Sequence, residues 1–126
     1  TAEDTAKTIT LSGSDPEGST LTYTIVGVPS SGTLSGNGST RSYMPNGNFN
    51  GSDTFTFKVN DGSLDSGAAT VTVNVSAVND APSATAQTVS TAEDTPKTIT
   101  LSGTDPEGST LSYSIVTGPS NGSITN

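Results

Sequence analysis

The chain has 126 residues, no cysteine, histidine or tryptophan, and one methionine. Its formal charge of −8, from twelve acidic and four basic residues, argues against nucleic acid and anionic membrane surfaces as partners and is compatible with divalent cations. Because histidine and cysteine are absent, the usual general bases, nucleophiles and soft-metal ligands are missing, and we do not expect an enzyme.

Apolar and hydroxyl residues alternate with a period of two from the start of the chain, which predicts β-strands. The first two such stretches are residues 7–13 and 21–26. Threonine or serine on the other face is typical of an antiparallel sheet with one solvated side. The residues predicted to face inward are Ile9, Leu11, Leu21, Tyr23 and Ile25.

The middle of the chain continues the pattern. Residues 31–45 predict two short strands around a Gly-Asn-Gly turn, and residues 53–61 and 68–78 predict two longer ones. Turn residues separate the strands at intervals of roughly ten residues, which favours an all-β sandwich without helices. The inward residues predicted here are Leu34, Tyr43, Phe55, Phe57, Val59, Ala69, Val71, Val73 and Val75.

An internal repeat divides the chain. Residues 91–126 align without a gap on residues 1–36, with 25 identities and 11 differences. A period of 90 residues corresponds to a whole domain rather than to a solenoid unit. We therefore predict a first repeat at 1–80 that lacks its first strand, and the N-terminal part of a second repeat at 81–126. We expect the natural protein to continue in both directions.

The stretch Ser-Asp-Pro-Glu-Gly-Ser-Thr-Leu at 14–21 returns at 104–111 with threonine in place of the serine. Aspartate, proline and glycine at these spacings favour a type I turn, because proline presets φ and aspartate accepts hydrogen bonds from the backbone. Two carboxylates two residues apart also offer hard oxygen ligands to a cation. The turn alone does not distinguish these interpretations.

The motifs AEDT, SDPEGSTL, FNGSDTFTF, VNDG and VNDAP occur in this order along the sequence. With this order, which covers nearly the whole chain, the sequence resembles the bacterial cadherin-like, tandem Ig-like repeat of large surface adhesins. It implies a seven-stranded Greek-key antiparallel β-sandwich, an extracellular location at the bacterial cell surface, and Ca²⁺ between successive domains. The implied function is a spacer stiffened by calcium that mediates cell adhesion or filament and biofilm assembly. Any targeting segment is expected outside this sequence.

The same resemblance implies two sets of calcium ligands. The first lies at the top of a repeat, and the second spans the junction between repeats. Asn48 and Asn50 stand where acidic residues would be expected, which favours the weaker affinities of extracellular sites. The first set comprises Asp15, Glu17 and Asp61; the second comprises Glu3, Asp4, Asn79, Asp80, Asp105 and Glu107.

The family resemblance implies polysaccharide as a further possible partner, and the incomplete repeats predict a second copy of the chain as another. A carbohydrate-binding module is the alternative function. It needs an exposed aromatic residue, and Tyr43 is the best candidate if Met44 faces inward instead.

The incomplete repeats also predict head-to-tail assembly. In one form residues 84–90 donate the missing first strand to a neighbouring chain, and in the other the later strands of one chain complete the second repeat of another. Neither nucleic acid nor membrane insertion is expected, since no apolar run approaches the ~20 residues of a span.

Overall fold

The computed structural model describes residues 1–125 and divides the chain into two compact units. Unit 1 spans Thr1–Val78, and unit 2 begins at Asn79. This boundary lies two residues before the one predicted. Among the described residues the fold is all-β, and no helix is long and apolar enough to cross a membrane.

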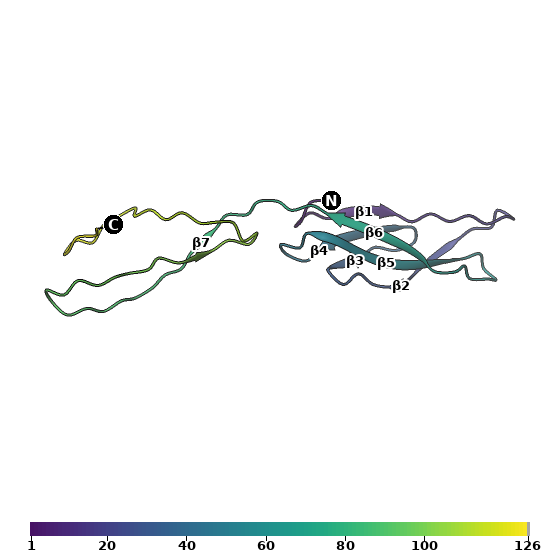
Figure 1. Cartoon of the computed structure of the whole chain (residues 1–126). Coiled ribbons are helices and arrows are strands. Elements are labelled where there is room, and N and C mark those ends of the chain that lie inside the picture. The colour runs from purple at the N-terminus through teal and green to yellow at the C-terminus, as the bar shows by residue number, and fades with distance from the viewer. Residues whose placement is uncertain (126) are drawn as a thin grey trace. The chain divides into compact units, whose positions relative to one another are not determined.

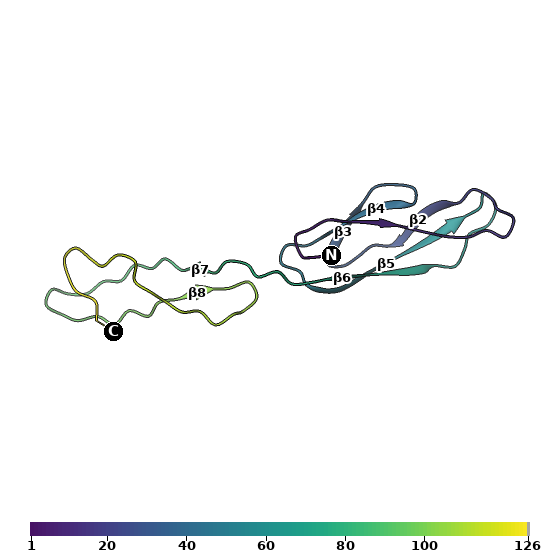
Figure 2. The ribbon, with the colours of Figure 1, turned by 90° about the horizontal axis from the view of Figure 1, so that it is seen from above.

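Unit 1 contains two three-stranded antiparallel sheets with the strand orders β1-β4-β3 and β2-β5-β6. Its strands run along the long direction of the unit in Figure 1, and Figure 2 shows them from above. Every predicted strand of this part is present. The bounds are β1 Lys7–Thr10, β2 Thr22–Gly27, β3 Gly32–Ser35, β4 Thr40–Pro45, β5 Gly51–Asn60 and β6 Ala69–Val75.

The register of the ladders brings the inward residues together. Tyr43 lies opposite both Lys7 and Leu34, and Ile25 lies opposite Phe57. The β2–β5 register shifts between Ile25 and Gly27, which marks a β-bulge. Most of the predicted inward side chains lie in the core or pack against it.

The core of unit 1 consists of Leu11, Tyr43, Phe55, Phe57, Val73 and Val75. Tyr23 packs against it, with its ring stacked on that of Phe57 at a centroid distance of 6.3 Å. Burial of each such large side chain contributes about 1.5–3 kcal/mol. The alternation predicted these residues correctly because every second position of an antiparallel strand faces the same side.

Two expectations about individual residues need correction. Ala69 lies on the same side of β6 as Val71 and Val73 but is exposed; it is the first residue of β6 and forms the last pair of the β5–β6 ladder. Tyr43 has no exposed surface, whereas Met44 is 42% exposed. Tyr43 is therefore a core residue, and the best candidate for a sugar-binding platform is not accessible.

Unit 2 contains one short antiparallel pair, β7 (Ser83–Ala84) with β8 (Gly103–Thr104). The pairing extends by one bond from the Thr85 amide to the Ser102 carbonyl, at 2.9 Å. Extended chain continues on both sides of this pair (Figure 2). The segment that was predicted to precede the second repeat's strands thus pairs with residues of its own unit.

Candidate functional site

The two acidic turns have the same geometry in both units. In unit 1 the Gly18 amide donates to the Asp15 carbonyl at 3.1 Å, and the Ser19 amide donates to the Asp15 carboxylate at 2.8 Å. Gly18 has a φ of 77°, a left-handed conformation that favours glycine. One carboxylate oxygen of Asp15 therefore holds the turn together. Both interpretations of the motif remain compatible with this geometry, because Glu17 and the other Asp15 oxygen make no hydrogen bond among residues 1–125.

The copy of this turn in unit 2 adds a contact to the linker. Asp105 accepts from the Ser109 amide at 2.8 Å and from the Glu107 amide at 3.2 Å. The pKa of Asp105 is lowered, chiefly by the hydrogen bond from Ser109. Glu107 in turn accepts from the Asp80 amide at 3.0 Å. The Asn79 side chain donates to the Asp80 carbonyl at 3.2 Å. These four predicted ligands are thus connected. The Oδ2 of Asp80 is buried and accepts no hydrogen bond from residues 1–125.

Glu3 is the most buried of the predicted ligands, with 3% of its surface exposed. Its backbone amide donates to the Ser76 carbonyl at 2.9 Å, and the Val78 amide donates to its Oε1. Its Oε2 is buried and accepts no hydrogen bond within the described part of the chain. A buried carboxylate oxygen without a donor is costly, which makes Glu3 a suitable ligand for a cation.

Asp4 and Asp61 have local structural roles. Asp4 has a φ of 54°, and its carboxylate accepts from the Asn48 amide at 3.2 Å. Asp61 accepts from the amides of Ser63 and Leu64, both at 2.7 Å. The pKa of Asp61 is lowered, chiefly by the hydrogen bond from Leu64. The two bonds to Asp61 hold the turn after β5. No hydrogen bond in residues 1–125 connects Asp61 to the first acidic turn.

The predicted ligands therefore fall into separate places. Within residues 1–125, no three carboxylates converge closely enough to surround one ion. The structure brings Asp80, Asp105 and Glu107 into one hydrogen-bonded chain, and it buries Glu3 against Val78. A glutamate accepts from the backbone amide on each side of Asn79. Glu3 accepts from Val78, and Glu107 accepts from Asp80.

A buried carboxylate that the sequence reasoning missed lies in the core of unit 1. Asp53 is 3% exposed and accepts from the Ser31 amide and the Tyr43 hydroxyl, both at 2.9 Å. The amides of Ser30 and Thr54 also donate to it, at 3.1 and 2.9 Å. Burial alone would raise the pKa of Asp53, but these hydrogen bonds together lower it. The pKa of Tyr43 is raised to about 12. Burial is the main cause, and the hydrogen bond to Asp53 and the negative charge of Asp53 add to it.

The signal for Asp53 was present in the sequence. Asp53 has the same parity as Phe55 and Phe57, so the alternation places its carboxylate on the inward face. A buried carboxylate needs donors, and the backbone amides of Ser30 and Ser31 supply them across the sandwich. This network fixes the 30–31 turn against β5 and is structural.

Comparison with known proteins agrees with this architecture. The sequence profile of the family described as Bacterial Ig domain matches residues 1–74 and 79–126, and the chain belongs to this family. The predicted Ig-like repeat and all-β fold are confirmed. The chain is also similar to integrin beta-like protein A of Dictyostelium discoideum, with 36% identity over an alignment of 118 residues; the match covers 77% of this chain. The chain spans 6% of that relative's length.

Proposed function

We propose that this chain is part of a large exported surface protein, in which it acts as a spacer and adhesive repeat that Ca²⁺ stiffens. Membership of the bacterial Ig domain family supports a structural module, and the similarity to an integrin beta-like protein supports adhesion at a cell surface. Cell adhesion and filament or biofilm assembly are the roles that such a repeat would serve. A carbohydrate-binding role has no comparable support, because Tyr43 is buried.

The observation that carries the calcium proposal is the buried Oε2 of Glu3, which accepts no hydrogen bond in residues 1–125. In unit 2 a buried carboxylate oxygen of Asp80 likewise accepts no hydrogen bond within the described residues. Ca²⁺ binds six to eight oxygens and tolerates irregular geometry, so these carboxylates fit it chemically. Glu3 and Asp4 would supply ligands from unit 1, and Asp80, Asp105, Glu107 and Asn79 would supply them from unit 2.

The ion would neutralise carboxylates that otherwise leave buried charge uncompensated. Because Glu3 holds the Val78 amide and Glu107 holds the Asp80 amide, fixing these two side chains restrains the segment that joins the units. Stiffening thus follows from cation binding to residues that already contact the linker. Asp15, Glu17 and Asp61 would supply further oxygens at the first turn and after β5.

Thermal unfolding in Ca²⁺ and in chelator tests the proposal. At about 10 mM Ca²⁺ and a Kd of about 0.1–1 mM, ligand linkage stabilises the folded chain by about 1.4–2.7 kcal/mol. This corresponds to a rise in Tm of roughly 5–20 °C for a domain of this size. Glu3→Gln should lose most of the rise and should not melt lower than the parent in chelator, since the amide oxygen still accepts from Val78.

Glu93→Gln is the matched control. Glu93 occupies the position equivalent to Glu3 in the second repeat but is exposed, so its charge does not need a partner. The control should retain the calcium response of the parent. A parent Tm that is the same in Ca²⁺ and in chelator would contradict the proposal.

A further inference from the structure

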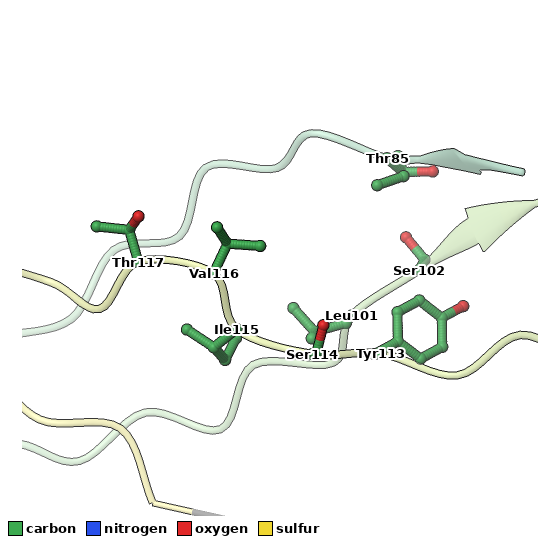
Figure 3. Close-up of a pocket in the computed structure, with 9 residues that line it drawn as sticks. Thr85, Leu101, Ser102, Tyr113, Ser114, Ile115, Val116 and Thr117 are labelled. Atoms are coloured by element: carbon green, nitrogen blue, oxygen red, sulfur yellow. The ribbon is translucent and has the colours of Figure 1, made fainter.

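Reactive side chains other than the carboxylates are few in this chain, because histidine and cysteine are absent. In unit 2 a hollow of about 360 Å³ is lined by hydroxyl, aromatic and aliphatic side chains (Figure 3). None of these lining residues carries a carboxylate, a side-chain amide or an amine. The remaining chemistry therefore lies in the asparagine side chains.

Unit 1 contains three Asn-Gly sequences, at 37–38, 46–47 and 50–51. Asparagine is chemically labile, and a following glycine favours its loss of ammonia. Glycine has no Cβ, so its backbone nitrogen can approach the side-chain carbonyl of the preceding residue. The three sequences are alike in this respect, and the fold decides which of them can react.

Asn37 lies in the turn between β3 and β4, which can be followed in Figure 2. Its side chain is exposed and makes no hydrogen bond within residues 1–125, and the Gly38 amide donates none there. Gly38 has a φ of 58°, and a Cβ placed on it would have no atom within 4 Å. The Asn37 side chain and the Gly38 nitrogen are therefore both free to approach each other.

The backbone of Asn46 is held on both sides. Its amide donates to the Ser31 carbonyl at 2.9 Å, and its carbonyl accepts from the Phe49 amide at 3.1 Å. Ring closure requires rotation between the Cα and the carbonyl carbon of Asn46, which would strain the bond from Phe49. Asn46 should therefore react more slowly than Asn37.

Asn50 precedes a glycine that belongs to a strand. Gly51 begins β5 and lies opposite Val75 in the β5–β6 ladder. On one side of β6, Ser76 donates to Thr1 and accepts from Glu3, so the backbone of Val75 faces the other side, toward Gly51. The ladder must open locally before the Gly51 nitrogen can attack, which slows the reaction at Asn50.

We propose that Asn37 is a site of spontaneous deamidation in the folded chain. The Gly38 nitrogen loses its proton to base and forms a bond to the Cγ of Asn37. The bond from Cγ to Nδ2 breaks, and ammonia leaves after water returns a proton to it. Water then opens the five-membered imide at either carbonyl, which yields aspartate or isoaspartate. Water is the only co-reactant, and nothing is oxidised or reduced.

The reaction adds one negative charge to a chain whose formal charge is −8. Isoaspartate also lengthens the main chain by one carbon in the turn between β3 and β4. Because this turn contributes no side chain to the core, the modified chain should remain folded. The product is thus a charge isoform whose amount increases with the age of the protein, and the inference does not depend on calcium binding.

Peptide mapping of the aged chain tests the proposal. Cleavage after Lys7, Arg41 and Lys58 places Asn37 in the peptide 8–41 and the other two Asn-Gly sequences of unit 1 in the peptide 42–58. The native chain is incubated at mildly alkaline pH, digested and analysed by mass spectrometry, with fragmentation to distinguish Asn46 from Asn50. The same two peptides, incubated free in solution, give the rates without the fold.

The folded chain should deamidate at Asn37 within about threefold of the rate in the free peptide, whereas Asn46 and Asn50 should be slowed at least about tenfold. The rate at Asn37 should rise roughly tenfold from pH 7 to pH 8, because the deprotonated fraction of an amide rises tenfold per pH unit below its pKa. Enzymatic methylation of isoaspartate in the peptide 8–41 should confirm the imide route.

Two variants give matched controls. Asn37→Gln should lose the product in the peptide 8–41, because the longer side chain would have to close a six-membered ring. Asn46→Gln should leave the product at Asn37 unchanged. The proposal would be overturned if the fold slowed Asn37 as much as Asn46 and Asn50, or if the folded parent stayed unmodified at Asn37 while the free peptide reacted.

Discussion

Removal of the Tyr43 hydroxyl should destabilise unit 1 without altering its core packing. Tyr43→Phe keeps the buried ring and removes the 2.9 Å hydrogen bond to Asp53. A hydrogen bond to a charged group contributes about 1.5–3 kcal/mol, and three backbone amides still donate to Asp53. We therefore expect a loss of about 1.5–3 kcal/mol in the free energy of unfolding.

The pH dependence makes this prediction more specific. The pKa of Tyr43 is raised from 10.0 to about 12, so its contribution is present below pH 10 and is lost as the pH rises through 12. The pKa of Asp53 is lowered from 3.8, so its contribution is present above pH 3.8 and is lost as the pH falls through the lower folded value. Tyr43→Phe should abolish the alkaline loss of stability and move the acid loss to higher pH.

Urea unfolding followed by circular dichroism between pH 2 and pH 12 measures both effects. Tyr23→Phe is the control, because it keeps the ring that stacks on Phe57 and changes no hydrogen bond of Asp53. The reasoning would be refuted if Tyr43→Phe and Tyr23→Phe had the same stability across this range.

Two further predictions compare matched positions. Gly32→Ala should destabilise unit 1 by about 1–3 kcal/mol, because its Cβ would lie 2.5 Å from the Tyr43 ring. Gly67→Ala, with open space around it, should not destabilise unit 1. Urea unfolding measures both variants, and equal effects would contradict the packing described. Leu11→Ala should cost about 2–5 kcal/mol, whereas Leu101→Ala, at the equivalent but 41% exposed position, should cost far less in the monomer. A similar loss from both leucine variants would show that unit 2 has a packed core.

Much of the fold was predictable from alternation alone. Phe55 and Phe57 could be placed inward because two apolar residues separated by one polar residue share a face of a strand. Ala69 has the same parity but is exposed, because parity gives the direction of a side chain and not the extent of the core. Asp53 was missed because a carboxylate on the inward face is unusual unless donors are present, and its donors come from a distant turn.

The candidate site was predictable in part. The family resemblance implied that Asp80 would meet Glu107, and the Asp80 amide donates to the Glu107 carboxylate, 27 residues further along the chain. The burial of Glu3 could not be predicted, because it depends on the amide of Val78, 75 residues further along the sequence. Local patterns identify which residues can serve as ligands, but only the tertiary fold shows which carboxylate oxygens lack a donor.

Calorimetric titration of the chain with Ca²⁺ tests the central claim most directly. The account predicts saturable binding with a Kd of about 0.1–1 mM, the range of extracellular modules. Glu93→Gln should bind like the parent, and Glu3→Gln should lose binding at this affinity. Absence of saturable binding by the parent, or equal binding by Glu3→Gln and the parent, would contradict the assignment of Glu3 as a calcium ligand.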